Sequence, residues 1–184
     1  MNSIQLMIDE HVYIKRMLQV LRKASFNLLK GETPDYDDFY KMIDFVKTYA
    51  DDHHHGKEEK LLFNRMEEEL GDTGKVIIKQ GMLVEHDMGR FHMAELRKAL
   101  EELKKGNEEA KLDIIANAVG YANLLARHID KEDNVVYRFA ERELTKETLE
   151  EVNHQCQAFE AKQAELGIQS KYIALVDELE RKYS

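Results

Sequence analysis

The sequence has no tryptophan, one proline and one cysteine among its 184 residues. A single proline leaves long stretches that can stay helical without a break. The lone cysteine, Cys156, excludes an internal disulfide, so we expect a protein of the reducing cytoplasm. No apolar run approaches the roughly 20 residues of a membrane-spanning helix, and the N-terminus lacks the basic-then-apolar pattern of a signal peptide.

Basic residues are fewer than acidic ones, 27 against 36, so the formal net charge is -9. This charge argues against a nucleic acid or an anionic membrane as a partner. The composition, 43% hydrophobic and 34% charged with few helix breakers, is typical of an all-α protein. The length suits one domain with an ample core. Whether the chain has a protein partner stays open.

Apolar residues recur three and four positions apart in six segments, which predicts six helices. These segments span about 3–30, 35–70, 73–105, 108–143, 145–166 and 170–183. The first four are long and joined by short connections, a pattern that favours an up-down-up-down four-helix bundle over residues 1–144. Residues 145–184 are then expected to form a C-terminal helical extension packed on the bundle.

Four histidines and two glutamates interrupt the apolar faces of the first four segments. They are His11, His54, Glu58, His86, His128 and Glu132. The second and fourth segments each carry a His-x-x-x-Glu pair, whose two side chains lie on one helical face. A buried imidazole or carboxylate needs a hydrogen-bond partner or a metal ion.

The spacing of these six residues along their helices predicts that they meet in one layer. In an up-down-up-down bundle with a rise of ~1.5 Å per residue, each crossing returns to the same height within about a turn. Six ligands exceed the needs of one tetrahedral zinc ion and suit two metal ions bridged by two carboxylates. Imidazole and carboxylate without thiolate are compatible with iron, manganese or zinc, and we favour two iron ions.

The neighbouring histidines are not expected to take part. In a regular α-helix, His55 shares a face with Lys47 and Asp51, which predicts that it is solvated. His53 and His55 are therefore expected to face solvent or to lie beside the site.

The ordered set of motifs resembles the hemerythrin-like (HHE cation-binding) domain family. That family has a lone His in the first helix, His-x-x-x-Glu in the second, Glu-His in the third and His-x-x-x-Glu in the fourth. The corresponding residues are Glu10-His11, His54 with Glu58, Glu85-His86, and His128 with Glu132. The resemblance spans roughly residues 4–142. It implies a non-haem di-iron centre with Glu58 and Glu132 as bridging carboxylates, and a small ligand such as O₂, peroxide or nitric oxide.

One departure from the family pattern bears on function. Oxygen-carrying members place a second His four residues after the one in the third helix, where this sequence has Arg90. Three hypotheses follow. The chain is a di-iron protein for sensing, scavenging or storing dioxygen or a related ligand. Alternatively, it is a di-iron enzyme that removes peroxide or nitric oxide or repairs iron centres, or a helical interaction module whose metal is structural or absent.

Overall fold

The computed structural model describes residues 2–184, and within that range it contains helices and no strands. The prediction of an all-α chain is confirmed. Several long helical rods alternate between α-helix and short segments of π-helix, which are labelled η. The elements are α1 (Ser3–Leu29), α2 (Tyr36–Phe45), η1 (Val46–His55), η2 (Glu58–Phe63), α3 (Asn64–Glu69), α4 (Gly71–Lys75), η3 (Val76–Met82), α5 (Leu83–Lys104), α6 (Ala110–Lys131), η4 (Glu132–Val136), α7 (Tyr137–Glu143), α8 (Lys146–Glu165) and α9 (Ile168–Lys182).

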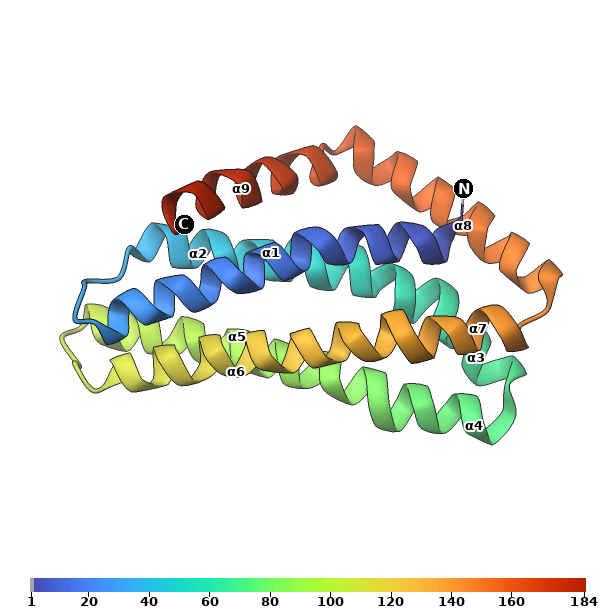
Figure 1. Cartoon of the computed structure of the whole chain (residues 1–184), viewed down its shortest axis with the longest axis horizontal. Coiled ribbons are helices and arrows are strands. Elements are labelled where there is room, and N and C mark those ends of the chain that lie inside the picture. Colours follow the sequence, from blue (N-terminus) through green and yellow to red (C-terminus); the bar gives the residue numbers. More distant parts are fainter. Residues whose placement is uncertain (1) are drawn as a thin grey trace.

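Four rods lie alongside one another in the molecule (Figure 1). The first is α1, the second runs from α2 to α3, the third from α4 to α5, and the fourth from α6 to α7. Short turns join consecutive rods, so neighbours in the chain run in opposite directions. Helices α8 and α9 form an angled pair that packs on α1 and the second rod.

The ends of the last two helices follow simple capping chemistry. Thr145 caps α8, with its side chain accepting a hydrogen bond from the Thr148 N–H at 3.1 Å. Gly167 separates α8 from α9 with a φ of +69°, a left-handed conformation that glycine adopts without strain. None of the helices within residues 2–184 combines the length and apolar character that a membrane crossing requires.

The hydrophobic core is divided in two. One cluster includes Leu21, Phe45 and Leu100, and the other includes Met7 and Tyr137. The buried histidines and carboxylates lie on the parts of the four rods that separate these two clusters. A polar layer inside a bundle is stable only when its members satisfy one another or bind an ion.

Three of the π-helical segments begin or end at this polar layer, since η1 ends at His55, η2 begins at Glu58 and η4 begins at Glu132. In a π-helix the N–H of residue i+5 bonds to the carbonyl of residue i, so the helix phase differs from that of an α-helix. As a result His53, His54 and His55 are all buried. Neither His53 nor His55 faces solvent, because the expectation of solvent exposure assumed a regular α-helix. His53 lies beside the site, which was the other expectation, whereas His55 joins the candidate ligands.

Candidate metal centre

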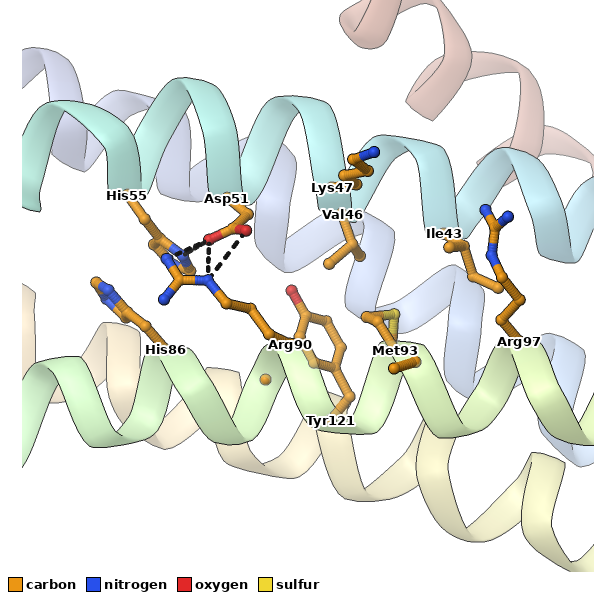
Figure 2. Close-up of a pocket in the computed structure, with 12 residues that line it drawn as sticks. Ile43, Val46, Lys47, Asp51, His55, His86, Arg90, Met93, Arg97 and Tyr121 are labelled. Atoms are coloured by element: carbon orange, nitrogen blue, oxygen red, sulfur yellow. Dashed lines mark hydrogen bonds and ion pairs between the residues drawn. The ribbon is translucent and has the colours of Figure 1, made fainter.

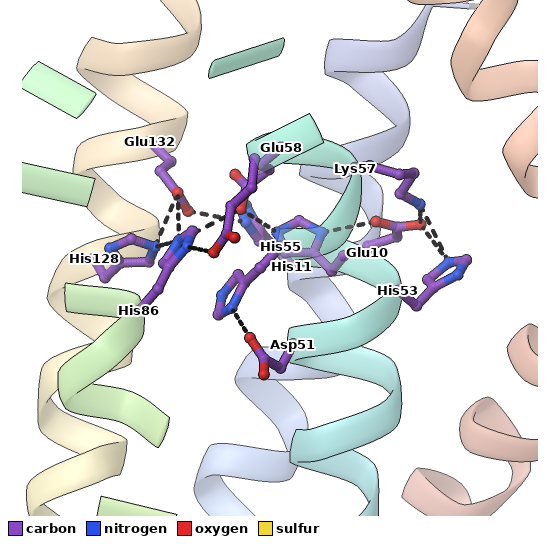
Figure 3. Close-up of polar contacts among 12 residues, drawn as sticks. Glu10, His11, Asp51, His53, His55, Lys57, Glu58, His86, His128 and Glu132 are labelled. Carbon is purple, nitrogen blue, oxygen red and sulfur yellow. Dashed lines mark hydrogen bonds and ion pairs between the residues drawn. The ribbon is translucent and has the colours of Figure 1, made fainter. Parts of the chain in front are cut away.

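The structure brings the six predicted residues into one buried layer and adds His55 to them (Figure 3). None of the six is more than 1% exposed, and His55 is 5% exposed. Each of the four rods contributes. The contributing elements are α1 with His11, η1 with His54 and His55, η2 with Glu58, α5 with His86, α6 with His128 and η4 with Glu132.

These seven side chains form two groups that share Glu58. In each group the candidate ligand atoms all lie within 4.8 Å of one another. The first group is His55, Glu58, His86 and His128, and the second is His11, His54, Glu58 and Glu132. Glu132 also spans both groups, because one carboxylate oxygen is 2.9 Å from His128 Nε2 and the other is 3.3 Å from His11 Nε2. Both carboxylates are therefore positioned between the two groups.

Several inward-facing atoms of the site lack hydrogen-bond partners within the described residues. Five buried atoms make no hydrogen bond: His11 Nε2, His54 Nε2, Glu58 Oε2 and both carboxylate oxygens of Glu132. Leaving buried polar atoms unpaired costs ~1–3 kcal/mol each. His86 Nε2 and His128 Nε2 are 3.0 Å apart, which is the separation of two nitrogens bound to one ion at right angles at about 2.1 Å. The donor set therefore fits metal ions.

The outward-facing nitrogen of each of the five histidines is held by a carboxylate. The Nδ1 pairs are His11 with Asp133 (2.7 Å), His54 with Glu10 (2.7 Å), His55 with Asp51 (3.3 Å), His86 with Glu59 (2.7 Å) and His128 with Glu85 (2.9 Å). A carboxylate that accepts from Nδ1–H leaves the Nε2 lone pair free for a metal and fixes the ring orientation. Sequence reasoning missed these five carboxylates.

Four of these five carboxylates are adjacent in the chain to a candidate ligand, but each holds a histidine of another rod, whereas Asp51 holds His55 within η1. Glu10 precedes His11 in the chain, yet it accepts a hydrogen bond from His54. Glu85 likewise accepts from His128 on the neighbouring rod. Consecutive helical residues point about 100° apart, so an acidic residue beside a ligand faces the next helix and not its own neighbour. An acidic residue next to a buried ligand is the pattern to look for.

The two central carboxylates have opposite ionisation properties. Burial and the charge of Glu132 raise the pKa of Glu58 well above its usual range. Burial also opposes ionisation of Glu132, but His128 and the other facing histidines lower its pKa well below its usual range. Tyr137 stays protonated, since burial raises its pKa, and its hydroxyl donates to Glu58 Oε1 at 2.5 Å. Tyr137 was not predicted, and it lies five residues after Glu132, one π-helical turn away.

The candidate histidines also differ in the direction in which their pKa is shifted. Burial is the main cause that lowers the pKa of His54 to about 4, with the charge of His11 adding to it. Burial and the neighbouring His86 also lower the pKa of His55. Both rings are therefore neutral at neutral pH, which is the form that binds metals. For His11 and His86, burial is outweighed by carboxylate partners, and their pKa is raised.

A third group lies beside the centre and already contains a cation. Glu10, His53 and Glu160 have metal-ligand spacing. The ammonium of Lys57 already lies among them, beside Glu10 and His53 (Figure 3) and in contact with Glu160. Lys57 contacts both carboxylates, and its Nζ is 3.2 Å from His53 Nε2. Because Glu160 belongs to α8, this cluster joins the C-terminal helices to Glu10, the partner of a candidate ligand.

Arg90 is not placed to bind a metal ion. Its guanidinium donates to Asp51 Oδ1 at 3.0 Å and to Glu59 Oε1 at 2.6 Å, the carboxylates that hold His55 and His86. Arg90 also lines a pocket of about 320 Å³ that reaches His55 and His86 (Figure 2). Arg90 thus supports two of the carboxylates that hold candidate ligands.

Comparison with known proteins gives one match. No curated protein and no solved structure matches the chain. A family model described as the hemerythrin HHE cation binding domain matches residues 2–140, a range that includes all seven side chains of the site. The chain therefore belongs to the hemerythrin HHE cation-binding domain family.

Proposed function

We propose that this protein binds two iron ions, bridged by Glu58 and Glu132, and uses them to bind dioxygen or a related small ligand such as peroxide or nitric oxide. The observation that carries the proposal is the set of unpaired, buried nitrogen and oxygen atoms in two groups that share Glu58. Manganese or zinc would also be compatible with these nitrogen and oxygen donors. In this proposal, residues 1–144 form the metal-binding bundle and residues 145–184 form its extension.

The geometry favours an unequal division of the histidines. His11 and His54 would hold one ion, and His55, His86 and His128 would hold the other. His55 thus supplies, from the second rod, the histidine that Arg90 replaces on the third.

Iron ions bound there would supply one-electron redox chemistry and open coordination positions. The chain's own residues would orient this chemistry. The outer carboxylates keep each imidazole in one tautomer. The Tyr137 hydroxyl, whose oxygen is 2.5 Å from Glu58 Oε1, donates its proton in a hydrogen bond to this shared carboxylate. The pocket that reaches His55 and His86 favours a ligand-binding centre over a structural one, because structural metal sites are closed.

Metal analysis and optical spectroscopy test the proposal. We expect about two irons per chain after anaerobic loading, and a new charge-transfer absorption after exposure to air. His54→Ala and Glu58→Ala should lose metal but keep their helical circular dichroism, whereas the exposed His154→Ala should resemble the wild type. Full metal content in either site variant would contradict the ligand assignment.

The same preparation separates the functional alternatives. Reversal of the spectrum under vacuum would favour binding for sensing or storage. Steady turnover of peroxide or nitric oxide would favour the enzyme. A protein that binds zinc, or no metal, and is silent to oxygen would favour the structural module and would contradict the proposal.

A further inference from the structure

We propose that the pocket beside the metal centre binds an organic monocarboxylate with an apolar body, about ten non-hydrogen atoms in size. This inference goes beyond the binding of a diatomic ligand. It rests on the pocket and not on the metal content, so it does not depend on the proposed function.

The size of the pocket exceeds what a diatomic ligand needs. Its volume is about 320 Å³, and a water-sized group takes up about 30 Å³ in a liquid, which corresponds to about ten such groups. The walls include Ile43, Val46 and Met93, from the second and third rods (Figure 2). Ligand sites are typically apolar clefts of this kind with a few convergent polar groups.

Tyr121 supplies one such polar group. Its side chain is 1% exposed, and its hydroxyl makes no hydrogen bond within the described residues. Figure 2 shows this hydroxyl directed toward the space between η1 and α5. Gly89 allows the approach of the ring, because a Cβ there would lie 3.3 Å from Tyr121 Cε2. A buried hydroxyl without a partner is costly, and a ligand oxygen would satisfy it.

Two cations favour an anionic ligand. Lys47 and Arg97 line the pocket and are exposed. Neither makes an ion pair anywhere in residues 2–184, although the chain carries a net charge of -9. Arg90, in contrast, is already neutralised by Asp51 and Glu59. Arg97 has its guanidinium carbon 5.9 Å from the centroid of the Tyr40 ring, a contact that leaves its charge without a carboxylate partner. Lys47 and Arg97 have long, flexible side chains that can close over a carboxylate held by Tyr121.

Calorimetry with octanoate tests the inference on the purified full chain, both metal-free and iron-loaded. Octanoate has ten non-hydrogen atoms, and octan-1-ol is its neutral counterpart. We expect one octanoate per chain, and at least about tenfold weaker binding of octan-1-ol. The doubly charge-reversed variant, Lys47→Glu with Arg97→Glu, should weaken octanoate binding about tenfold or more. Lys98→Glu, outside the pocket, should leave it unchanged.

Two further variants test the position of the ligand. Met93→Trp fills the pocket and should abolish binding, and circular dichroism checks that it folds. Tyr121→Phe removes only the hydroxyl and should weaken binding about two- to tenfold, the value of one hydrogen bond. No binding of octanoate, or binding that both variants leave unchanged, would overturn the inference. Binding to metal-free protein that takes up no iron would sustain it while the proposed function fails.

Discussion

The imidazole rings of His55 and His86 are stacked, with centroids 3.8 Å apart and planes within 10° of parallel. The two rings come from different rods, η1 and α5, and both have their Nδ1 atoms held by carboxylates. This stacking places His55 in the group with Glu58 and His128, where an α-helical phase would have pointed it to solvent.

We expect His55→Ala to lower the metal content from about two ions per chain to about one. The variant removes a candidate ligand of one ion and leaves the His11 and His54 group intact. Elemental analysis of the purified protein measures the effect. His154→Ala, in an exposed position of α8, is the matched control and should keep full content. An unchanged metal content in His55→Ala would show that His55 only packs against His86.

Lys57→Met should lower the free energy of unfolding by about 3–5 kcal/mol, the usual effect of removing one partner from a buried ion pair. Lys57 is fully buried and contacts Glu10 and Glu160, so its removal leaves two carboxylates without their cation. Urea denaturation measures the change. Lys146→Met, at a residue whose side chain is 91% exposed, should change stability by less than about 0.5 kcal/mol. A similarly small effect at Lys57 would mean that α8 does not depend on this pair.

Two glycines should respond to alanine in opposite directions. A Cβ on Gly74 would lie 2.1 Å from the backbone oxygen of Met66, whereas one on Gly81 would meet nothing within 4 Å. Gly74→Ala should therefore destabilise the protein by about 1–3 kcal/mol through overpacking. Gly81→Ala should stabilise it by about 0.5–1 kcal/mol, because alanine is the better helix former. Thermal unfolding followed by circular dichroism compares the pair, and a shift of the same sign in both would contradict the packing of α3 against α4.

Alkylation of Cys156 should depend strongly on folding and on pH. Burial raises the pKa of this thiol to about 11, and the thiolate is the reactive form. Iodoacetamide at pH 8 should thus modify the folded protein far more slowly than the urea-unfolded one, with the folded rate rising toward pH 11. Since the unfolded thiol ionises first, near pH 8.5, the contribution of Cys156 to stability falls as the pH rises above about 8.5. Rapid modification at pH 8 under native conditions would show that α8 does not stay packed on the bundle.

Much of the fold could be predicted from the sequence because its signals are local. Helix periodicity, a cap such as Thr145 and a break such as Gly167 are properties of short segments. The structure has a break between the fifth and sixth predicted segments, 145–166 and 170–183, where the periodicity expected one. The six candidate residues could also be placed in one layer, because the rise of an α-helix and the short connections determine height along a bundle.

The composition of the site beyond those six residues was decided by tertiary structure. The π-helical phase of η1 brings His55 inward. The spacing of apolar residues at three and four positions does not reveal this change of phase. Four of the five outer carboxylates, such as Glu10 with His54, hold a histidine of another rod, so the packing of the rods decides these pairs. Likewise, the pocket at Tyr121 exists only where residues of the second, third and fourth rods meet. The sequence by itself determined the helices and the level of the histidines, whereas packing between rods decided which groups surround them, because those contacts join residues far apart in the chain.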